Sequence, residues 1–355
     1  MASFYLPRDI DEMVRRLTPD AERFAGKTVL LCGGAGFLGR YFTVLLSALN
    51  ERVLTSNPCR VIICDNLITS GAHGAHDLAL NGFRFVTHNI IEPLAIEEPI
   101  DYVIQAAGIA SPYYYRKYPL ETLEVATTGT KRMLNLGLTH QLKGFLFFSS
   151  SEIYGDPDAR HVPTPESYRG NVSCLGPRAC YDESKRLGET LCAIYHQLHG
   201  VPVTMVRPFN VYGPGMQETD YRVLPNFASR IVGKKPLQVY GHGNQTRTFC
   251  YITDAIIGFL KVLLHGIPGH AYNIGNPEPE ISMLDLVKRL ERVIGRELDL
   301  CLVEYPDTYP ADEPQRRCPD IRKAAVQVGH APLVSLDDGL SRFMEWALAH
   351  YTGAT

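Results

Sequence analysis

Short apolar runs of about five residues alternate with longer amphipathic segments through the first 207 residues of the chain. Runs of this length between segments of helical periodicity predict parallel strands that helices cover on both faces. The expected strands are residues 27–32, 60–64, 83–87, 102–107, 145–149 and 203–207. The expected helices are residues 37–49, 120–138 and 181–199. The pattern therefore predicts an α/β fold with a doubly wound parallel sheet.

The pattern changes after about residue 208, where glycine and proline become frequent and the expected helices shorten. These later helices are residues 224–232, 254–264 and 283–294. We expect a sheet domain over residues 25–207 and a smaller α/β lobe over residues 208–350. The segment of about 247–275 is a candidate to rejoin the sheet domain.

An N-terminal extension, residues 1–24, precedes the first expected strand. It contains a short amphipathic helix whose apolar face consists of Ile10, Met13, Val14 and Leu17. Such a face can bind a membrane or a partner, but packing on the chain's own domain is the expectation here.

Charge and hydropathy exclude some functional classes. The 355 residues carry a net charge of −3, from 35 Lys and Arg against 38 Asp and Glu. A general nucleic-acid-binding protein usually has a basic surface, so no nucleic-acid partner is expected. The chain has no run of about 18 apolar residues, and its N-terminus lacks the apolar core of a signal peptide. No membrane partner is expected either.

The nine cysteines are scattered, and no pair has Cys-x-x-Cys spacing. A chain of this length buries a core without disulfides, so the cysteines indicate a reduced, cytoplasmic protein. Metal chemistry through His73, His76 or His88 is a weak alternative, because no carboxylate at ligand spacing completes a site. We therefore expect no metal.

A glycine-rich turn, residues 33–39 (Gly-Gly-Ala-Gly-Phe-Leu-Gly), joins the first expected strand to the first expected helix. The missing side chains permit a tight turn and a close approach of the backbone to a pyrophosphate. The N-terminus of the following helix adds free N–H groups and a positive dipole end. This context predicts a Rossmann-type site for NAD. The expected contacts are Gly33, Gly36, Phe37, Leu38 and Gly39.

Asp65 ends the second expected strand and is followed by Asn66. A carboxylate there accepts hydrogen bonds from the adenosine ribose and repels a 2′-phosphate, which favours NAD over NADP. The polar insert at residues 50–58 explains why Asp65 lies farther from the turn than usual. The alternative is an aspartate that caps a helix or a turn.

Tyr181 and Lys185 stand at positions i and i+4 of an expected helix, so they share one face. A tyrosine is a poor base near neutral pH, because its ordinary pKa is about 10. A neighbouring lysine cation and a positive nicotinamide favour the phenolate, which can then take a proton from a sugar hydroxyl. Ser150, at the end of an earlier strand, can bridge the tyrosine and the substrate hydroxyl. The alternative is an ordinary surface pair and a turn serine.

Together these segments resemble the extended short-chain dehydrogenase/reductases, a family of NAD-dependent nucleotide-sugar epimerases and dehydratases. The resemblance spans residues 27–346 and also includes residues 207–214 (Arg-Pro-Phe-Asn-Val-Tyr-Gly-Pro). Within that family, the UDP-glucuronate decarboxylases, or UDP-xylose synthases, are most similar. The segments that resemble them are residues 150–157, 176–183, 239–247, 273–277 and 317–321.

The pair Ser151-Glu152 distinguishes the subfamilies. Dehydratases of this family generally carry Asp-Glu after the serine or threonine of the site, and simple 4-epimerases generally lack an acid there. The resemblance therefore implies C4 oxidation of UDP-glucuronate, decarboxylation, and re-reduction to UDP-xylose. The implied catalytic residues are Ser150, Glu152, Tyr181, Lys185 and Arg247. Tyr181, Lys185, Asp65 and Asn66 would also contact the cofactor.

The resemblance also implies a nucleotide-sugar site in the C-terminal lobe. Its implied residues are Ser151, Asn210, Arg222, Asn226, Tyr240, Gln245, Arg247 and Arg317. Arg247 could bind the sugar carboxylate, assist protonation at C5, or contact the diphosphate. Glu152 could relay a proton through water or repel the carboxylate. The family commonly dimerises through the two long helices, which implies a homodimer.

Several residues depart from the decarboxylase pattern. Ala126 replaces the usual asparagine of the long helix, Asn89 replaces an aspartate near the adenine, and residues 107–112 read Ala-Gly-Ile-Ala-Ser-Pro. Residues 113–115 are three tyrosines near the expected sugar pocket. These departures leave the sugar open. The alternatives are a 4-epimerase or 4,6-dehydratase, and a non-enzymatic protein that senses the cofactor on the same fold.

Overall fold

The computed structural model describes residues 3–70, 83–220, 222–304 and 314–354. Seven parallel strands form its central sheet in the order β11-β6-β5-β4-β1-β2-β3. These strands are β1 (Thr28–Cys32), β2 (Arg60–Asp65), β3 (Phe83–Thr87), β4 (Tyr102–Gln105), β5 (Gly144–Phe148), β6 (Val203–Pro208) and β11 (Ala271–Ile274). The predicted doubly wound parallel sheet is confirmed. The expected strand over residues 102–107 is shorter, since it ends at Gln105.

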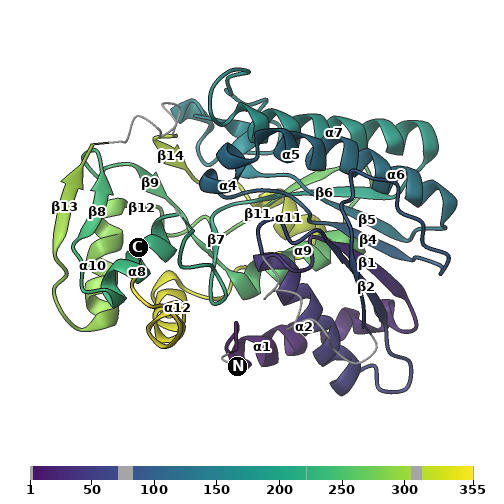
Figure 1. Cartoon of the computed structure of the whole chain (residues 1–355), viewed down its shortest axis with the longest axis horizontal. Coiled ribbons are helices and arrows are strands. Elements are labelled where there is room, and N and C mark those ends of the chain that lie inside the picture. Colours follow the sequence, from purple (N-terminus) through teal and green to yellow (C-terminus); the bar gives the residue numbers. More distant parts are fainter. Residues whose placement is uncertain (1–2, 71–82, 221, 305–313, 355) are drawn as a thin grey trace.

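Helices cover both faces of this sheet (Figure 1). One layer contains α2 (Phe37–Arg52) and α9 (Ile252–His265), and the other contains α5 (Pro119–Glu124), α6 (Thr130–Thr139) and α7 (Ala179–His199). Alternate residues of β1 enter the two cores: Val29 and Leu31 pack toward α2 and α9, while Leu30 and Cys32 pack toward α6 and α7. This double burial explains why the strand is apolar throughout.

The helix expected over residues 120–138 is interrupted. A π-helical turn, Val125–Gly129, separates α5 from α6. The Gln105 side chain donates to the Val125 carbonyl at 3.4 Å, so a side chain from β4 enters the hydrogen-bonding pattern of the helix. The chain is thus helical from Pro119 to Thr139, as expected, but its middle turn is π-helical, which the local pattern did not predict.

The C-terminal residues form a smaller lobe beside the sheet (Figure 1). It contains a parallel strand pair and a small three-stranded sheet. The strands are β8 (Leu237–Tyr240), β13 (Leu300–Val303), β9 (Thr246–Arg247), β12 (Ile281–Ser282) and β14 (Arg316–Arg317). The helices are α8 (Val223–Val232), α10 (Met283–Ile294) and α12 (Leu336–His350). Between β9 and β12 the chain returns to the main sheet through α9 and β11. Helix α11 (Arg322–Val328) packs on β11.

The N-terminal extension is part of the folded body. Helix α1 (Pro7–Leu17) packs on α9 and α2, and its apolar face is buried. Buried Asp9 accepts hydrogen bonds from Tyr251 at 2.7 Å and from Arg342 of α12 at 2.9 Å. A short strand pair, β7 (Val211–Tyr212) with β10 (Cys250–Tyr251), carries Tyr251. The extension therefore ties the sheet layer to the lobe.

All nine cysteines lie in the described part of the chain, and none of them forms a disulfide there. Among the described helices, none has the length and apolar content needed to cross a membrane.

Candidate functional site

The glycine turn leads from β1 into α2 at the point where the strand order reverses, with β2 on one side of β1 and β4 on the other. Gly33 has a φ of +81°, and a Cβ atom there would lie 2.6 Å from the Ala107 nitrogen. A Cβ on Gly39 would lie 2.1 Å from the Gly33 oxygen. A Cβ on Gly36, the residue that caps α2, would meet only that oxygen, at 3.4 Å. Backbone atoms therefore pack closely against Gly33 and Gly39, whereas the space beside Gly36 is open. This arrangement fits a pyrophosphate at the helix N-terminus.

A cavity of about 190 Å³ opens in front of this turn. It is lined by the residues predicted for the cofactor on β1, α2 and β2, together with Asn89, Gly108 and Arg222. The predicted residues are Gly33, Gly36, Phe37, Leu38, Gly39, Asp65 and Asn66. These residues fit an NAD molecule, whose adenosine end would lie at Asp65.

Asp65 caps a turn, which was the alternative to a ribose contact, and it also accepts a hydrogen bond from the glycine turn. One carboxylate oxygen accepts from the Leu67 N–H at 2.8 Å, as a turn aspartate does, and the other accepts from Ala35 in the glycine turn at 2.9 Å. Burial raises the pKa of Asp65. Since each oxygen can accept more than one hydrogen bond, the carboxylate can hold the turn and still meet a ribose.

Ser150, Tyr181 and Lys185 come together at the ends of β5 and α7. Ser150 follows β5, and its hydroxyl lies near enough to the Tyr181 phenol to lower the pKa of that phenol. The Lys185 ammonium donates to the Phe148 carbonyl at 2.7 Å and lies 5.7 Å from the centre of the Tyr181 ring. The tertiary structure therefore unites three side chains that lie up to 35 residues apart in the sequence.

The pKa values of Tyr181 and Lys185 do not by themselves favour the phenolate form of the tyrosine. Burial raises the pKa of Tyr181, while the Ser150 hydrogen bond and the positive charges of Arg222 and Arg178 oppose that increase. Burial lowers the pKa of Lys185 to about 8. Without the cofactor, the protein thus favours the neutral phenol, and the positive nicotinamide would have to shift the equilibrium toward phenolate.

Tyr115 is a site residue that sequence reasoning missed. Its ring stacks on that of Tyr181, with centroids 5.6 Å apart and planes 16° apart. Both rings are buried, with Ile109 in the same cluster. Tyr115 is the third of three consecutive tyrosines, and nothing in their spacing indicates that it contacts the proposed base.

Glu152 lies at the centre of a charged cluster that the sequence did not predict. Arg317 of β14 grips its carboxylate with two hydrogen bonds, 2.6 and 2.8 Å long. Arg178, just before α7, forms an ion pair with the same carboxylate. Arg178 was missed, although it stands three residues before Tyr181 in a segment that carried the resemblance.

The other predicted substrate residues lie around the lobe. Arg247 is buried, and it donates to the carbonyls of Thr246 at 2.8 Å and Gln315 at 3.3 Å. Arg222 lines the cofactor cavity and forms a bidentate pair with Asp220. The remaining five residues, which include Tyr240, are buried or half-buried. The other four are Ser151 after β5, Asn210 after β6, Asn226 in α8 and Gln245 before β9, and Gln245 donates to the carbonyl of Tyr240, the last residue of β8.

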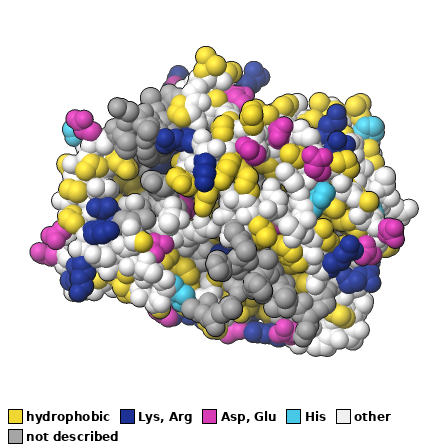
Figure 2. All heavy atoms as spheres, in the orientation of Figure 1, with side chains coloured by type: hydrophobic (Ala, Val, Ile, Leu, Met, Phe, Trp, Pro, Cys, Tyr) yellow, Lys and Arg dark blue, Asp and Glu magenta, His cyan; other side chains and the backbone are white. Residues whose placement is uncertain are grey.

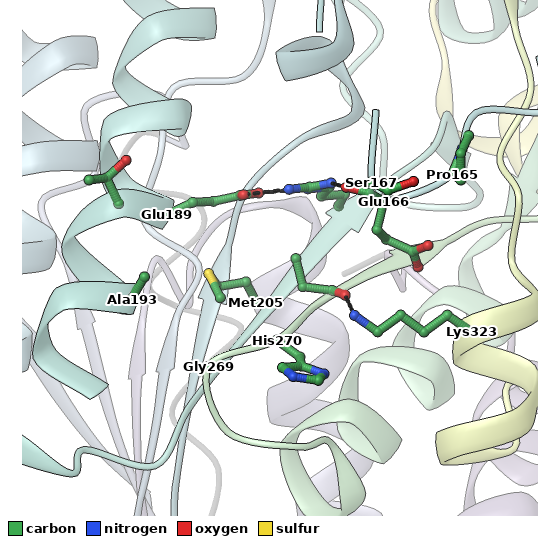
Figure 3. Close-up of a pocket in the computed structure, with 12 residues that line it drawn as sticks. Pro165, Glu166, Ser167, Glu189, Ala193, Met205, Gly269, His270 and Lys323 are labelled. Atoms are coloured by element: carbon green, nitrogen blue, oxygen red, sulfur yellow. Dashed lines mark hydrogen bonds and ion pairs between the residues drawn. The ribbon is translucent and has the colours of Figure 1, made fainter. Parts of the chain in front are cut away.

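A larger cavity, of about 620 Å³, contains none of the predicted site residues. It lies between α7 and α11 at the edge of the sheet (Figure 3). Arg207 forms a bidentate pair with Glu189 there, and Lys323 donates to the Ala271 carbonyl at 2.8 Å. Because none of the residues predicted for the cofactor or the substrate lines this cavity, it is not the candidate site.

Of the three histidines considered as metal ligands, only His88 lies among the described residues. His73 and His76 lie outside the described residues. In the described part of the chain, no three His, Cys, Asp or Glu side chains are grouped closely enough to hold a metal ion.

Comparisons with known proteins agree with this geometry. The model of the NAD dependent epimerase/dehydratase family matches residues 29–275. UDP-glucuronic acid decarboxylase 1 of Xenopus tropicalis is 36% identical over 321 residues, which cover 90% of this chain and 72% of that protein. UDP-glucuronic acid decarboxylase 5 of Arabidopsis thaliana is 37% identical over 313 residues, which cover 88% and 86%.

Solved structures show the same fold. A UDP-glucuronic acid 4-epimerase from Bacillus cereus, in complex with UDP-glucuronic acid and NAD, superimposes with a TM-score of 0.76 at 26% identity, covering 91% of this chain and 100% of that chain. A dTDP-glucose 4,6-dehydratase from Streptomyces venezuelae with NAD bound gives 0.78 at 26% identity, with 91% and 97% covered. The predicted family and the predicted NAD cofactor are confirmed. The chain belongs to the NAD-dependent epimerase/dehydratase family.

Proposed function

We propose that this protein is an NAD-dependent decarboxylase that converts UDP-glucuronate into UDP-xylose. The observation that carries the proposal is Glu152, an acid placed two residues after Ser150 and held among arginines beside Tyr181. Dehydratases and simple epimerases of the family generally differ at this pair of positions. The names of the two decarboxylases described above support the same activity.

The first step is removal of the proton from the C4 hydroxyl of the sugar. Tyr181 as phenolate accepts this proton, and Ser150 holds the hydroxyl and the phenol in one hydrogen-bonded group. When bound, NAD supplies the oxidant for C4 and later returns the same two electrons. Lys185 lies below the tyrosine and adds positive charge while it is protonated.

The second step is loss of carbon dioxide. Oxidation at C4 leaves the C5 carboxylate β to a ketone, so cleavage of the carbon–carbon bond sends the electron pair into an enolate. A proton then adds to C5, and the ketone is reduced. We assign Glu152 and Arg247 to this end of the sugar, where a carboxylate can relay a proton and a guanidinium can stabilise the negative charge.

We place the rest of the substrate along the C-terminal lobe. The sheet domain consists of about residues 25–207 together with about 247–275, and the lobe consists mainly of the rest of 208–350. Arg222 has the charge to bind a diphosphate, Arg317 has the charge to bind either the diphosphate or the sugar carboxylate, and Tyr240 has the ring to contact the uracil or ribose. Asn210, Asn226, Gln245 and Ser151 would complete the hydrogen bonding. Unpaired cysteines are usual in a reduced compartment, which supports a cytoplasmic location.

We also propose a homodimer. One face of α7 exposes Leu187, Ile194 and Leu198, and the adjoining α5 exposes Leu120 and Leu123. Figure 2 shows apolar side chains along the upper side, where Figure 1 places α5 and α7. Two copies that paired α5 and α7 would cover this face in a four-helix bundle.

Product mass tests the activity directly. Incubation of the protein with UDP-glucuronate and NAD should yield a nucleotide sugar that is lighter by one carbon dioxide. The Tyr181→Phe variant should lower turnover at least about a thousandfold, because it removes the proton acceptor. A product of unchanged mass, UDP-galacturonate, would make the protein an epimerase instead.

A further inference from the structure

The protein holds one of its own carboxylates in a complete carboxylate-binding site. Arg317 meets both oxygens of Glu152 with separate nitrogens, at 2.6 and 2.8 Å, and Arg178 pairs with one of the same oxygens. The side chains are mostly buried, with exposed fractions of 18% for Glu152, 11% for Arg178 and 9% for Arg317. Bidentate pairing with arginine is the geometry by which proteins recognise carboxylates.

We propose that Arg178 and Arg317 recognise the C5 carboxylate of the substrate, and that Glu152 occupies their site until the substrate binds. This inference rests on the proposed function and deepens it. It makes Arg178 a specificity-determining residue, which neither the motifs nor the comparisons indicated. It also gives Glu152 a role in the free protein besides any role in proton transfer.

The position of the cluster favours the carboxylate over the diphosphate. The Ser150 hydroxyl accepts from the Glu152 N–H at 3.2 Å, so Glu152 lies directly beside the serine assigned to the C4 hydroxyl. The Tyr181 N–H donates to the backbone carbonyl of Arg178 at 2.9 Å, so Arg178 lies within one turn of the proposed base. The sugar carboxylate is attached to C5, next to C4, whereas the diphosphate is attached to C1 across the ring.

The charges allow an exchange of one carboxylate for another. Two guanidinium groups pair with Glu152, and Arg178 also donates to the Asp182 carboxylate, so the charges of these four side chains balance. Asp182 is close to Arg178, but the distance from its carboxylate to the guanidinium is longer, 3.4 Å. Arg317 is also the register partner of Arg247 in neighbouring strands β14 and β9, which brings a third cation to the same edge. An arriving carboxylate can therefore bind while Glu152 gives up part of its contact.

Competition with Glu152 would make the site selective. A carboxylate on the sugar can replace the contacts that Glu152 loses, whereas the neutral hydroxymethyl group of a hexose cannot. UDP-glucose would have to bind with the internal ion pairs intact. Removal of Arg178 should therefore weaken UDP-glucuronate and leave UDP-glucose nearly unchanged, and neutralisation of Glu152 should strengthen UDP-glucuronate.

The test is the affinity ratio of these two ligands, measured by calorimetry on the NAD-bound protein. All variants carry Tyr181→Phe, which prevents turnover. Arg178→Gln should weaken UDP-glucuronate about tenfold or more, and Glu152→Gln should strengthen it about threefold to tenfold, with UDP-glucose changed less than about twofold in both. Glu280→Gln is the matched control, because Glu280 pairs with Arg316, the neighbour of Arg317, and it should leave the ratio unchanged.

Other outcomes overturn the inference. Equal weakening of both ligands by Arg178→Gln would mean that the arginine contacts the diphosphate or supports the fold. An unchanged ratio in both variants would place the carboxylate elsewhere. Because Glu152→Gln keeps the size of the side chain and predicts tighter binding, a general loss of folding cannot imitate its result. Neither measurement requires carbon dioxide release, so failure of the proposed decarboxylation appears separately, in the product mass.

Discussion

The ammonium group of Lys185 illustrates how burial changes the chemistry of a single residue. It is enclosed by Phe147, Tyr181 and the backbone near Gly108, and its pKa is lowered to about 8. A lysine with its ordinary pKa of 10.5 would stay protonated through neutral and mildly alkaline pH. Lys185 instead loses its proton in the folded protein at about pH 8, and its positive charge with it.

This shift predicts a dependence of stability on pH. Because the unfolded chain binds the proton more tightly, stability should rise as the pH increases from about 8 to about 10.5. A shift from 10.5 to about 8 corresponds to about 3 kcal/mol of unfolding free energy. In the NAD-free protein, Lys185→Met should remove this contribution, so wild type should gain about 3 kcal/mol relative to the variant over that interval.

Urea unfolding of both proteins at several pH values provides the measurement. The comparison cancels the titration of other groups, since cysteines and tyrosines titrate in both proteins. Loss of the hydrogen bond to the Phe148 carbonyl changes the difference by a constant amount and leaves its slope unaffected. A difference that stays constant from pH 7 to pH 10.5 would contradict the lowered pKa.

At the scale of elements, the turn between β1 and α2 separates two uses of glycine. Gly39 is required by the fold, because a methyl group there would lie 2.1 Å from the Gly33 carbonyl oxygen. Gly36 has an ordinary φ of −73°, and a methyl group there would have only one contact, at 3.4 Å. Gly36 lines the cofactor cavity, so this methyl group would take up space there.

The two alanine variants should therefore fail differently. Gly39→Ala should lower the unfolding free energy by about 3 kcal/mol or more, because neighbouring backbone must move. Gly36→Ala should change stability by less than about 1 kcal/mol and weaken NAD at least about tenfold, because the methyl group occupies the space of the pyrophosphate. Thermal unfolding and NAD titration distinguish these effects. Unchanged NAD affinity in a folded Gly36→Ala protein would refute the assigned position of the pyrophosphate.

At the scale of the whole molecule, the exposed leucines of α5 and α7 predict the assembly. Leu198 and Leu120 are 71% and 72% exposed, which is unfavourable for two leucines on adjoining helices of a monomer. The double variant Leu187→Glu/Leu198→Glu should convert a dimer into a monomer, because two like charges would enter the shared helix face. Val326→Glu is the control, since Val326 is 85% exposed on α11 and should leave the dimer intact. Light scattering after size exclusion measures both, and a monomeric wild type would exclude the proposed bundle.

The pattern along the chain was sufficient for most of the fold and for part of the site. Periodicity is a local property, so it predicted six of the seven sheet strands and the cofactor turn, but not β11. Tyr181 and Lys185 could be paired because one helix places them four positions apart. The predicted cofactor residues Gly33, Phe37 and Asp65 line one cavity for the same reason: each stands at the end of a buried strand or the start of a helix.

Other features depended on contacts between segments far apart in the sequence. The π-helical turn at Val125 involves Gln105, and the stacking of Tyr115 on Tyr181 joins α4 (Pro112–Lys117) to α7. The cluster of Glu152, Arg178 and Arg317 spans 165 residues. Charge type and spacing alone leave such a group undetermined, because an arginine can neutralise any carboxylate that the fold brings within reach. The sequence by itself therefore determined most of the sheet strands, the cofactor turn and the proposed base, while only the tertiary structure decided which charges meet around the substrate.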